Sequence, residues 1–183
     1  MPTETETRSA VMSRIRSKDT EPELLFRKAL WATGLRYRTT LKGLGCRPDI
    51  VFPRGRLAIF VDGCFWHGCP EHYVFPRTNQ EFWSGKLEQN LLRDRRQTAD
   101  LEASGWRVMR LLEHQVFTEL ESSIHRVIAL LNNADDRNSG EFWRVISVED
   151  CGNGTERRVI TELRSGDESV VVQQRTTKKW IVR

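Results

Sequence analysis

Two aspartates at the ends of neighbouring apolar runs have the spacing of a divalent-metal site. Asp49 begins the run 49–52, Asp62 follows the run 57–61, and the turn sequence Pro-Arg-Gly-Arg lies between them. Antiparallel strands joined by such a turn would bring the two carboxylates together, and close carboxylates repel unless a cation lies between them. Oxygen ligands of this kind suit Mg²⁺. In the alternative interpretation, Asp49 only makes an Asx-type turn before its strand.

A segment rich in cysteine and histidine follows directly. Cys64, Cys69 and His72 are spaced by five and three residues, and His114 comes after a later strand candidate. Two thiolates and two imidazoles form the donor set of a closed, structural Zn²⁺ site, which would tie an irregular loop to the end of that strand. The spacing is not that of a standard zinc finger, so two buried free cysteines and two surface histidines are the alternative. Nothing in the chain signals secretion, which argues against disulfides.

His67 and the pair Phe65-Trp66 lie among those candidate ligands. Imidazole side chains titrate near neutral pH, so a histidine beside a metal-binding carboxylate can accept a proton from water. His67 could instead be the fourth zinc ligand in place of His114, or a hydrogen-bonded buried histidine. An aromatic pair in a tight loop can form a wedge that unstacks DNA base steps, whereas packing under the loop is the alternative.

The helix and strand patterns place these residues at strand ends and in one loop. A helix is predicted from Thr20 to Thr33, because Thr20 can cap it, Glu23 completes a capping box and Gly34 ends it. Apolar spacing predicts two further helices, 80–103 and 118–131. Strands are predicted over four short runs: 36–40, 49–52, 57–61 and 106–112.

After a polar linker, the hydrophobic pattern changes to period two. Four strand candidates follow: 142–148, 157–163, 170–174 and 179–182. They predict a small antiparallel sheet, docked on the preceding domain or extending from it, which has too little core to fold alone. The basic residues near its end are Arg175, Lys178, Lys179 and Arg183. These side chains could contact a DNA backbone, or they could only keep an exposed sheet edge from pairing with another chain.

The composition is that of one globular domain with some surplus length. Of the 183 residues, 38% are hydrophobic and 30% are charged, and the net charge is +4. The longest apolar runs, Leu57 to Val61 among them, are far shorter than the roughly 20 residues of a membrane helix, and the polar N-terminus has no signal-peptide core. We therefore expect a cytoplasmic protein. Residues 1–60 carry a charge of +6 and residues 61–138 a charge of −3, which suits phosphate binding and metal binding but also an ordinary solvated surface.

The order and spacing of these motifs resemble those of the very short patch repair endonucleases. The resemblance runs from about Thr7 to Leu131. It rests on the following segments: Arg8-Ser9, Asp19 to Glu23, Arg47 to Ile50, Val61 to Pro70, Asn79, Phe82-Trp83, Lys86, Asn90, Arg93-Asp94, Gly105-Trp106 and Glu113-His114. The family has the restriction-endonuclease-like fold. We therefore expect an α/β protein with a mixed sheet flanked by helices, a structural zinc and a small C-terminal antiparallel β extension that the resemblance does not cover.

The resemblance implies roles for individual residues. The Asp49 carboxylate and the Val61 backbone carbonyl would bind Mg²⁺, His67 would be the catalytic histidine, Asp94 would support His67, and Glu23 would lie near the active site. The implied zinc ligands are Cys64, Cys69, His72 and His114. The aromatic residues that would insert into DNA beside a mismatched base pair are Phe65, Trp66 and Trp83.

Positions 61 and 62 depart from the family pattern, because some members have threonine and histidine where this chain has Val61 and Asp62. A backbone carbonyl survives the change at position 61. Asp62 removes one proton-transfer group but supplies a second carboxylate, so we expect Asp62 in or near the metal shell.

The resemblance implies a Mg²⁺-dependent, strand-specific DNA endonuclease of mismatch repair, which nicks 5′ to the thymine of a T:G mismatch left by deamination of 5-methylcytosine. Its partner would be duplex DNA with that mismatch, with functional links to a DNA cytosine methyltransferase or to mismatch-repair proteins, and we expect a monomer. The alternatives are a nickase of a restriction or phage-defence system and a non-catalytic, zinc-stabilised DNA-binding module. The expected organisation is a basic arm (1–18), an endonuclease domain (19–132), a linker (133–140) and a β-rich extension (141–183).

Overall fold

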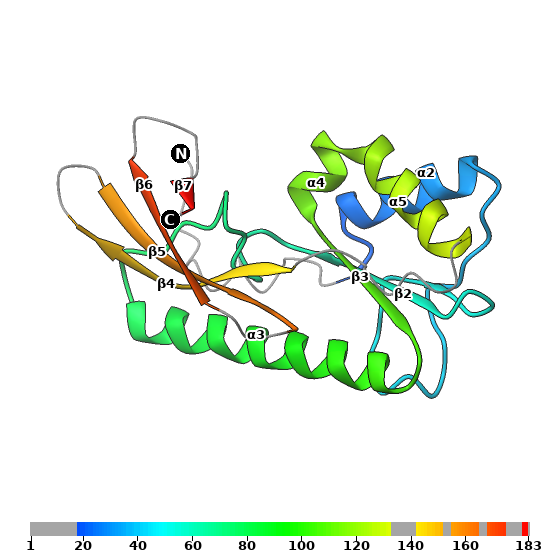
Figure 1. Ribbon diagram of the computed structural model, residues 1–183, viewed down its shortest axis with the longest axis horizontal. Helices are drawn as coiled ribbons and strands as arrows, with labels where there is room; N and C mark the ends of the chain where they lie inside the picture. The colour runs from blue at the N-terminus through cyan, green and yellow to red at the C-terminus, as the bar shows by residue number, and fades with distance from the viewer. Residues whose placement is uncertain (1–17, 133–141, 152–154, 165–167, 175–180, 183) are drawn as a thin grey trace, which may run out of the picture.

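The computed structural model describes residues 18–132, 142–151, 155–164, 168–174 and 181–182. The expected basic arm, apart from its last residue, and the expected linker lie outside these residues. In the described part, two sheets lie at opposite ends of the molecule, and α3 (Gln80–Ala103) runs along one side from one sheet to the other (Figure 1). None of the described helices combines the length and the apolar character that a membrane span requires.

The first sheet is mixed and has the order β1-β2-β3. β1 (Ile50–Phe52) pairs antiparallel with β2 (Leu57–Asp62), as predicted, and β2 pairs parallel with β3 (Arg107–Leu112). The parallel pair requires a crossover, which α3 provides. Three helices pack together on the other face of the sheet: α2 (Glu21–Ala32), α4 (Glu113–Thr118) and α5 (Leu120–Asn132) (Figure 1).

Strand alternation decides which residues of this sheet can form a site. Ile59 of β2 and Met109 of β3 belong to the core beneath α2 and α5, whereas Phe60 packs on the α3 side with Leu101. Successive side chains of a strand point to opposite faces, so Asp62 and Arg110 project on the α3 side. The face that holds α3 therefore carries charged groups among apolar ones.

The start of α2 differs from the predicted capping box. Thr20 makes no side-chain bond to the helix backbone; its hydroxyl donates to Glu23 Oε1 at 2.8 Å instead. Glu23 Oε2 accepts the backbone N–H of Asp19 at 3.0 Å. Glu23 is thus half of a capping box displaced by one residue. At the other end of α2, the predicted stop at Gly34 is confirmed by its φ of +87°.

One predicted strand is wrong, and one short helix was not predicted. The run 36–40 is no strand: it touches the sheet through a single bridge between Arg38 and Val51, and its side chains are mostly exposed, with Tyr37 alone of the five packed against the core. The predicted helix 118–131 is confirmed as α5, which begins at Leu120, and a further helix, α4, precedes it and ends at Thr118. The short α4 was missed because its six residues are too few to show a helical period.

The second sheet confirms the predicted antiparallel C-terminal sheet. Its order is β4-β5-β6-β7, with β4 (Trp143–Asp150), β5 (Thr155–Glu162), β6 (Glu168–Gln174) and β7 (Ile181–Val182). It docks on α3: Arg95 donates to the Leu163 carbonyl at 3.2 Å, and Arg164 pairs with Glu102 at 2.8 Å. The predicted basic cluster at positions 175, 178, 179 and 183 lies outside the described residues.

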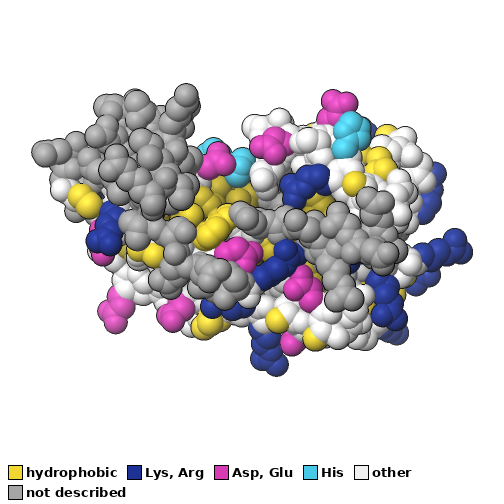
Figure 2. Space-filling model, in the orientation of Figure 1, with side chains coloured by type: hydrophobic (Ala, Val, Ile, Leu, Met, Phe, Trp, Pro, Cys, Tyr) yellow, Lys and Arg dark blue, Asp and Glu magenta, His cyan; other side chains and the backbone are white. Residues whose placement is uncertain are grey.

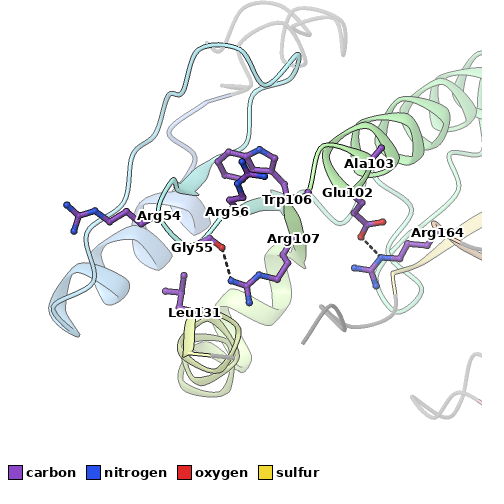
Figure 3. Close-up of a pocket in the computed structure, with 10 residues that line it drawn as sticks. Arg54, Gly55, Arg56, Glu102, Ala103, Trp106, Arg107, Leu131 and Arg164 are labelled. Carbon is purple, nitrogen blue, oxygen red and sulfur yellow. Dashed lines mark hydrogen bonds and ion pairs between the residues drawn. The ribbon is translucent and has the colours of Figure 1, made fainter. Parts of the chain in front are cut away.

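A cavity of about 950 Å³ lies where β2 and β3 begin and where α3 and α5 end (Figure 3). Neither helix has a basic residue in its last turn, so arginines from elsewhere bind their terminal carbonyls. Arg107 donates to the carbonyl of Leu130, near the end of α5, and to that of Gly55 at 2.7 Å. Arg56 reaches the Ser104 carbonyl beyond α3 at 3.4 Å. Arg56 and Arg107 therefore close helix ends at this cavity.

Replacement of Arg107 tests this structural role. Arg107→Met leaves two carbonyls without their donor, and we expect the free energy of unfolding to fall by about 1–3 kcal/mol in urea denaturation. Arg54→Met, at an exposed position on the same cavity, is the control and should change it by less than about 0.5 kcal/mol. Equal effects of the two substitutions would contradict the assignment.

Candidate active site

A cavity of about 660 Å³ on the α3 side of the first sheet brings together most of the residues that the sequence singled out. It is lined by segments from α2, β2, α3 and β3. The sequence-predicted residues on its wall are Glu23, Asp49, Val61, Asp62, Trp66, His67 and Asp94. The four candidate zinc ligands do not line it, but Glu113 does, and its carboxylate accepts the backbone N–H of Cys64 at 2.7 Å.

Asp49 presents one free carboxylate oxygen to this cavity. The Val61 N–H donates to Asp49 Oδ2 at 2.8 Å, and no described residue donates to Oδ1. The pKa of Asp49 is raised from 3.8 to about 6, chiefly by burial and also by the nearby carboxylates Glu23 and Asp62, against the opposing effects of the Val61 N–H and Arg27. A buried carboxylate with a free oxygen among other acids suits a divalent cation.

Glu23 acts on Asp49 through Arg27, a residue that sequence reasoning missed. Arg27 NH2 pairs with Glu23 Oε2 at 3.0 Å, one helical turn away on α2. The same guanidinium donates from Nε and NH2 to the Asp49 backbone carbonyl at 3.2 and 3.0 Å. Glu23 and Arg27 are both buried, so they fix the backbone from which the Asp49 side chain projects.

His67 is held by Asp94 of α3. Its Nδ1 lies 2.5 Å from Asp94 Oδ2 and 3.6 Å from Asp62 Oδ1. An ionised carboxylate only accepts hydrogen bonds, so Nδ1 carries the proton of this contact and Nε2 keeps a lone pair in the neutral ring. This arrangement gives the imidazole the orientation of a general base.

Asp62 is tied to two arginines. Arg110 donates to both of its carboxylate oxygens, each at 2.8 Å, and Arg144 of β4 donates to Oδ2, also at 2.8 Å. Burial raises the pKa of Asp62, but Arg110, His67 and Arg144 more than offset this, so the pKa lies well below its ordinary value. Arg110 also pairs with Asp94 at 3.1 Å.

Sequence reasoning missed both arginines. A signal for Arg110 existed, because a charged residue inside the apolar strand 107–112 requires a buried partner. Arg144 follows Trp143 in a strand beyond the part of the chain on which the family resemblance rests, and nothing in its neighbourhood points to Asp62.

The four predicted zinc ligands converge at the end of β3. Cys64 Sγ lies 3.3 Å from His114 Nδ1, and Cys69 Sγ lies 3.5 Å from the same nitrogen and 3.6 Å from His72 Nδ1. A tetrahedral zinc with ordinary Zn–S and Zn–N bonds separates sulfur and nitrogen ligands by about 3.5 Å. All four donor atoms lie within 4.8 Å of one another. The donor set and its spacing therefore fit a metal ion.

The aromatic residues predicted to enter DNA form one cluster. Phe65 stacks edge-to-face on Trp66 and Trp83, with ring centroids 5.2 and 5.3 Å apart, and Phe82 extends the cluster. Phe65 also touches the apolar cluster beneath the second sheet, so this ring serves packing as well. Phe82 is 55% exposed, which leaves apolar ring surface at the edge of the cluster.

Cations border the cavity. Arg47, Lys86 and Arg93 line it and are exposed. On the face shown in Figure 2, Lys and Arg side chains lie mainly over the half of the molecule that holds β1 to β3. Such charges suit the phosphate backbone of a nucleic acid.

Comparison with known proteins shows the family of this chain. Residues 3–72 match the family model of the DNA mismatch endonuclease Vsr. The chain is 41% identical over 133 residues to the type II nicking enzyme V.NaeI of Lentzea aerocolonigenes, an alignment that covers 70% of this chain and 78% of the relative. It is 47% identical over 105 residues to the type II nicking enzyme V.XorIIP of Xanthomonas oryzae, covering 56% and 76%.

The DNA mismatch endonuclease Vsr of Escherichia coli is 39% identical over 111 residues, which cover 58% of this chain and 69% of the relative. The chain belongs to the Vsr endonuclease family. It is a DNA endonuclease, which sets aside the non-catalytic module as an alternative. The relatives carry two kinds of name, mismatch endonuclease and nicking enzyme, so the family alone leaves the substrate open.

The buried Asp49 carboxyl predicts how stability depends on pH in the absence of Mg²⁺. Its pKa is about 6 in the folded protein and 3.8 ordinarily, so between these values the folded state holds a proton that the unfolded chain has lost. The contribution of this group to the free energy of unfolding therefore falls as the pH rises from about 4 to about 6.

Asp49→Asn removes this dependence, and we expect it to raise the Tm at pH 7 by about 3 °C or more. Thermal melts of both proteins between pH 4.5 and 7 measure it. The difference between the two curves isolates Asp49 from Asp62, whose lowered pKa acts in the opposite direction. Parallel curves for the two proteins would contradict the prediction.

Proposed function

We propose that this chain is a Mg²⁺-dependent endonuclease that nicks one strand of duplex DNA 5′ to the thymine of a T:G mismatch produced by deamination of 5-methylcytosine. The observation that carries the proposal is the pairing, in one cavity, of the Asp49 carboxylate with a His67–Asp94 dyad. The fold of the first sheet and its helices is, in this proposal, restriction-endonuclease-like.

Asp49 and the Val61 carbonyl would hold the Mg²⁺. The free Oδ1 of Asp49 and the raised pKa of this buried carboxyl support the assignment. When bound, the ion would polarise the scissile phosphate and stabilise the charge that develops on it. Arg27 and Glu23 keep the Asp49 backbone in place, so the ligand is preorganised.

His67 would take a proton from the attacking water. Its Nδ1–H bond to Asp94 leaves Nε2 as the acceptor and fixes the plane of the ring. Asp94 stabilises the imidazolium that forms, because its carboxylate is fully buried on α3. Asp62 belongs to the same centre, but with both oxygens engaged by arginines we assign it to positioning rather than to the metal.

The aromatic cluster would select the mismatch. Unstacking a T:G step costs less than unstacking a paired step, so an apolar wedge formed by Phe65, Trp66 and Trp83 enters it more readily. The cations at the cavity border would supply affinity that is independent of sequence. The contacts among the three rings support a wedge that acts as a unit.

Cys64, Cys69, His72 and His114 would hold a structural Zn²⁺. The sulfur–nitrogen distances support this donor set. The pKa of Cys69 lies below its ordinary value because its sulfur accepts hydrogen bonds from Cys64 and from the His72 backbone, against the effect of burial, so a thiolate is available. Zinc would join the loop to β3 through His114.

A second candidate function follows from the names of the relatives. V.NaeI and V.XorIIP are type II nicking enzymes, so a nickase associated with a restriction system is the alternative biology. It uses the same catalytic groups and differs in the DNA that is cut. In either case the chain would consist of a basic arm (1–18), an endonuclease domain (19–132), a linker (133–140) and a C-terminal extension (141–183).

A substrate panel tests the proposed function. With Mg²⁺, we expect single-strand nicking of a T:G duplex at least about tenfold faster than nicking of the matched duplex, and we expect Trp66→Ala to reduce this ratio. Asp49→Asn should abolish nicking and change the DNA Kd by less than about threefold, because it removes the metal ligand and no phosphate contact. Equal nicking of matched DNA would favour the nickase of a restriction system instead.

Metal analysis tests the zinc site. The purified protein should carry one Zn²⁺ per chain that a chelator removes slowly, and Cys64→Ser should lower the Tm by about 10 °C or more because metal binding contributes folding free energy. Cys151→Ser, at an exposed cysteine outside the cluster, is the control. Zinc-free protein that melts at the same temperature would rule the site out.

A further inference from the structure

The C-terminal sheet touches the loop that carries His67 at two backbone positions. The Val145 N–H of β4 donates to the Gly68 carbonyl at 2.8 Å, and Arg158 of β5 donates to the Pro70 carbonyl at 3.1 Å. Phe142 and Val145 also share an apolar cluster with Tyr73 of the same loop. The sheet is therefore built onto the loop and not only onto α3.

Gly68 makes the approach of β4 possible. Its φ is +62°, and a Cβ atom at this position would lie 2.7 Å from the Val145 carbonyl oxygen, so no other residue fits without displacing the strand. Gly68 stands between His67 and Cys69. The backbone of β4 is thus packed directly against the residue that joins the proposed base to the proposed zinc ligand.

The residue of β4 next to Val145 enters the buried charge set of the candidate active site. Arg144 is 2% exposed and donates to Asp62 Oδ2 at 2.8 Å. The set then holds two carboxylates, Asp62 and Asp94, and two guanidinium groups, Arg110 and Arg144. Without Arg144 the buried carboxylates would outnumber the buried guanidinium groups, which is costly in a low dielectric.

Asp62 also lies close to His67, where it competes with Asp94. Asp62 Oδ1 lies 3.6 Å from His67 Nδ1, the same nitrogen that Asp94 Oδ2 approaches to 2.5 Å. Two carboxylates thus compete for one N–H. Arg110 donates to both oxygens of Asp62 and Arg144 donates to Oδ2, so Asp62 is engaged by the arginines and Asp94 remains the partner that sets the ring plane. Loss of Arg144 would allow Asp62 to turn toward the histidine and draw the ring out of position.

We infer that Arg144 is a positioning residue of the nuclease and that the C-terminal sheet completes the active site by holding Asp62 away from His67. This inference rests on the proposed function, in which His67 is the base. The sheet that lies beyond the part of the chain resembling the family is thereby a part of the catalytic centre, and it acts through one buried side chain.

A double-mutant cycle between Arg144 and Asp62 tests the inference. The four proteins are the wild type, Arg144→Met, Asp62→Asn and the double variant, assayed by single-turnover nicking of the T:G duplex at saturating Mg²⁺ and well below each Tm. We expect Arg144→Met to slow nicking by about tenfold or more and to change the DNA Kd by less than about twofold. The reason is that a misplaced imidazole of His67 affects the chemical step alone. In the Asp62→Asn background the same substitution should change the rate by less than about twofold.

The control is Arg157→Met, which removes an arginine of β5 whose side chain is half exposed and lies 3.7 Å from Glu149; it should leave the nicking rate unchanged. If Arg144→Met does not fold, the comparison of Asp62→Asn with the double variant remains, because the double variant buries Asp94 with Arg110 as a balanced pair. Equal nicking rates for these two proteins support action through Asp62. A tenfold difference between them overturns it.

His67→Ala separates this inference from the proposed function. If His67→Ala abolishes nicking and Arg144→Met nicks at the wild-type rate, the positioning role is wrong and the active site stands. If His67→Ala itself nicks at the wild-type rate, the proposed active site is wrong, and the positioning role is overturned with it.

Discussion

Four buried charged side chains, Asp62, Asp94, Arg110 and Arg144, pair with one another and join both sheets to α3. These residues come from β2, α3, β3 and β4, so the packing of these elements must also bring the four charges together. Breaking one such buried pair costs about 3–5 kcal/mol. The sheets and α3 therefore have one arrangement in which every charge has a partner, and His67 takes its orientation from that arrangement.

The loop between β2 and α3 has no regular structure of its own, yet it carries the proposed base and three of the four proposed zinc ligands. Three sets of contacts fix the loop in place. Asp94 holds His67, the convergent thiols and imidazoles hold its middle, and β4 lies against Gly68. A preorganised loop of this kind costs little reorganisation during the reaction, which is why an irregular segment can serve catalysis.

Much of this fold could be predicted from the sequence, because strands and long helices can be recognised from the spacing of apolar residues along the chain. The pairing of β1 with β2, the length of α3 and the C-terminal sheet follow from such patterns. The run 36–40 was wrongly predicted as a strand, because its side chains are mostly exposed and do not pack as those of a sheet strand do. The helix α4 was missed because its six residues are too few to show a helical spacing of apolar residues. Arg144 could not be predicted: it lies 82 positions from Asp62, and only the folded chain brings the two together.

In the proposed mechanism the catalytic ion binds at Asp49, while His67 remains free of metal and keeps its lone pair for a proton. A second place for an ion exists, since Asp62, His67 and Asp94 also lie close enough to surround one. Anomalous scattering from crystals of the protein soaked in Mn²⁺, as a stand-in for Mg²⁺, measures the position directly. An anomalous peak between the Asp49 carboxylate and the Val61 carbonyl is the predicted result, and a peak among Asp62, His67 and Asp94 would contradict it.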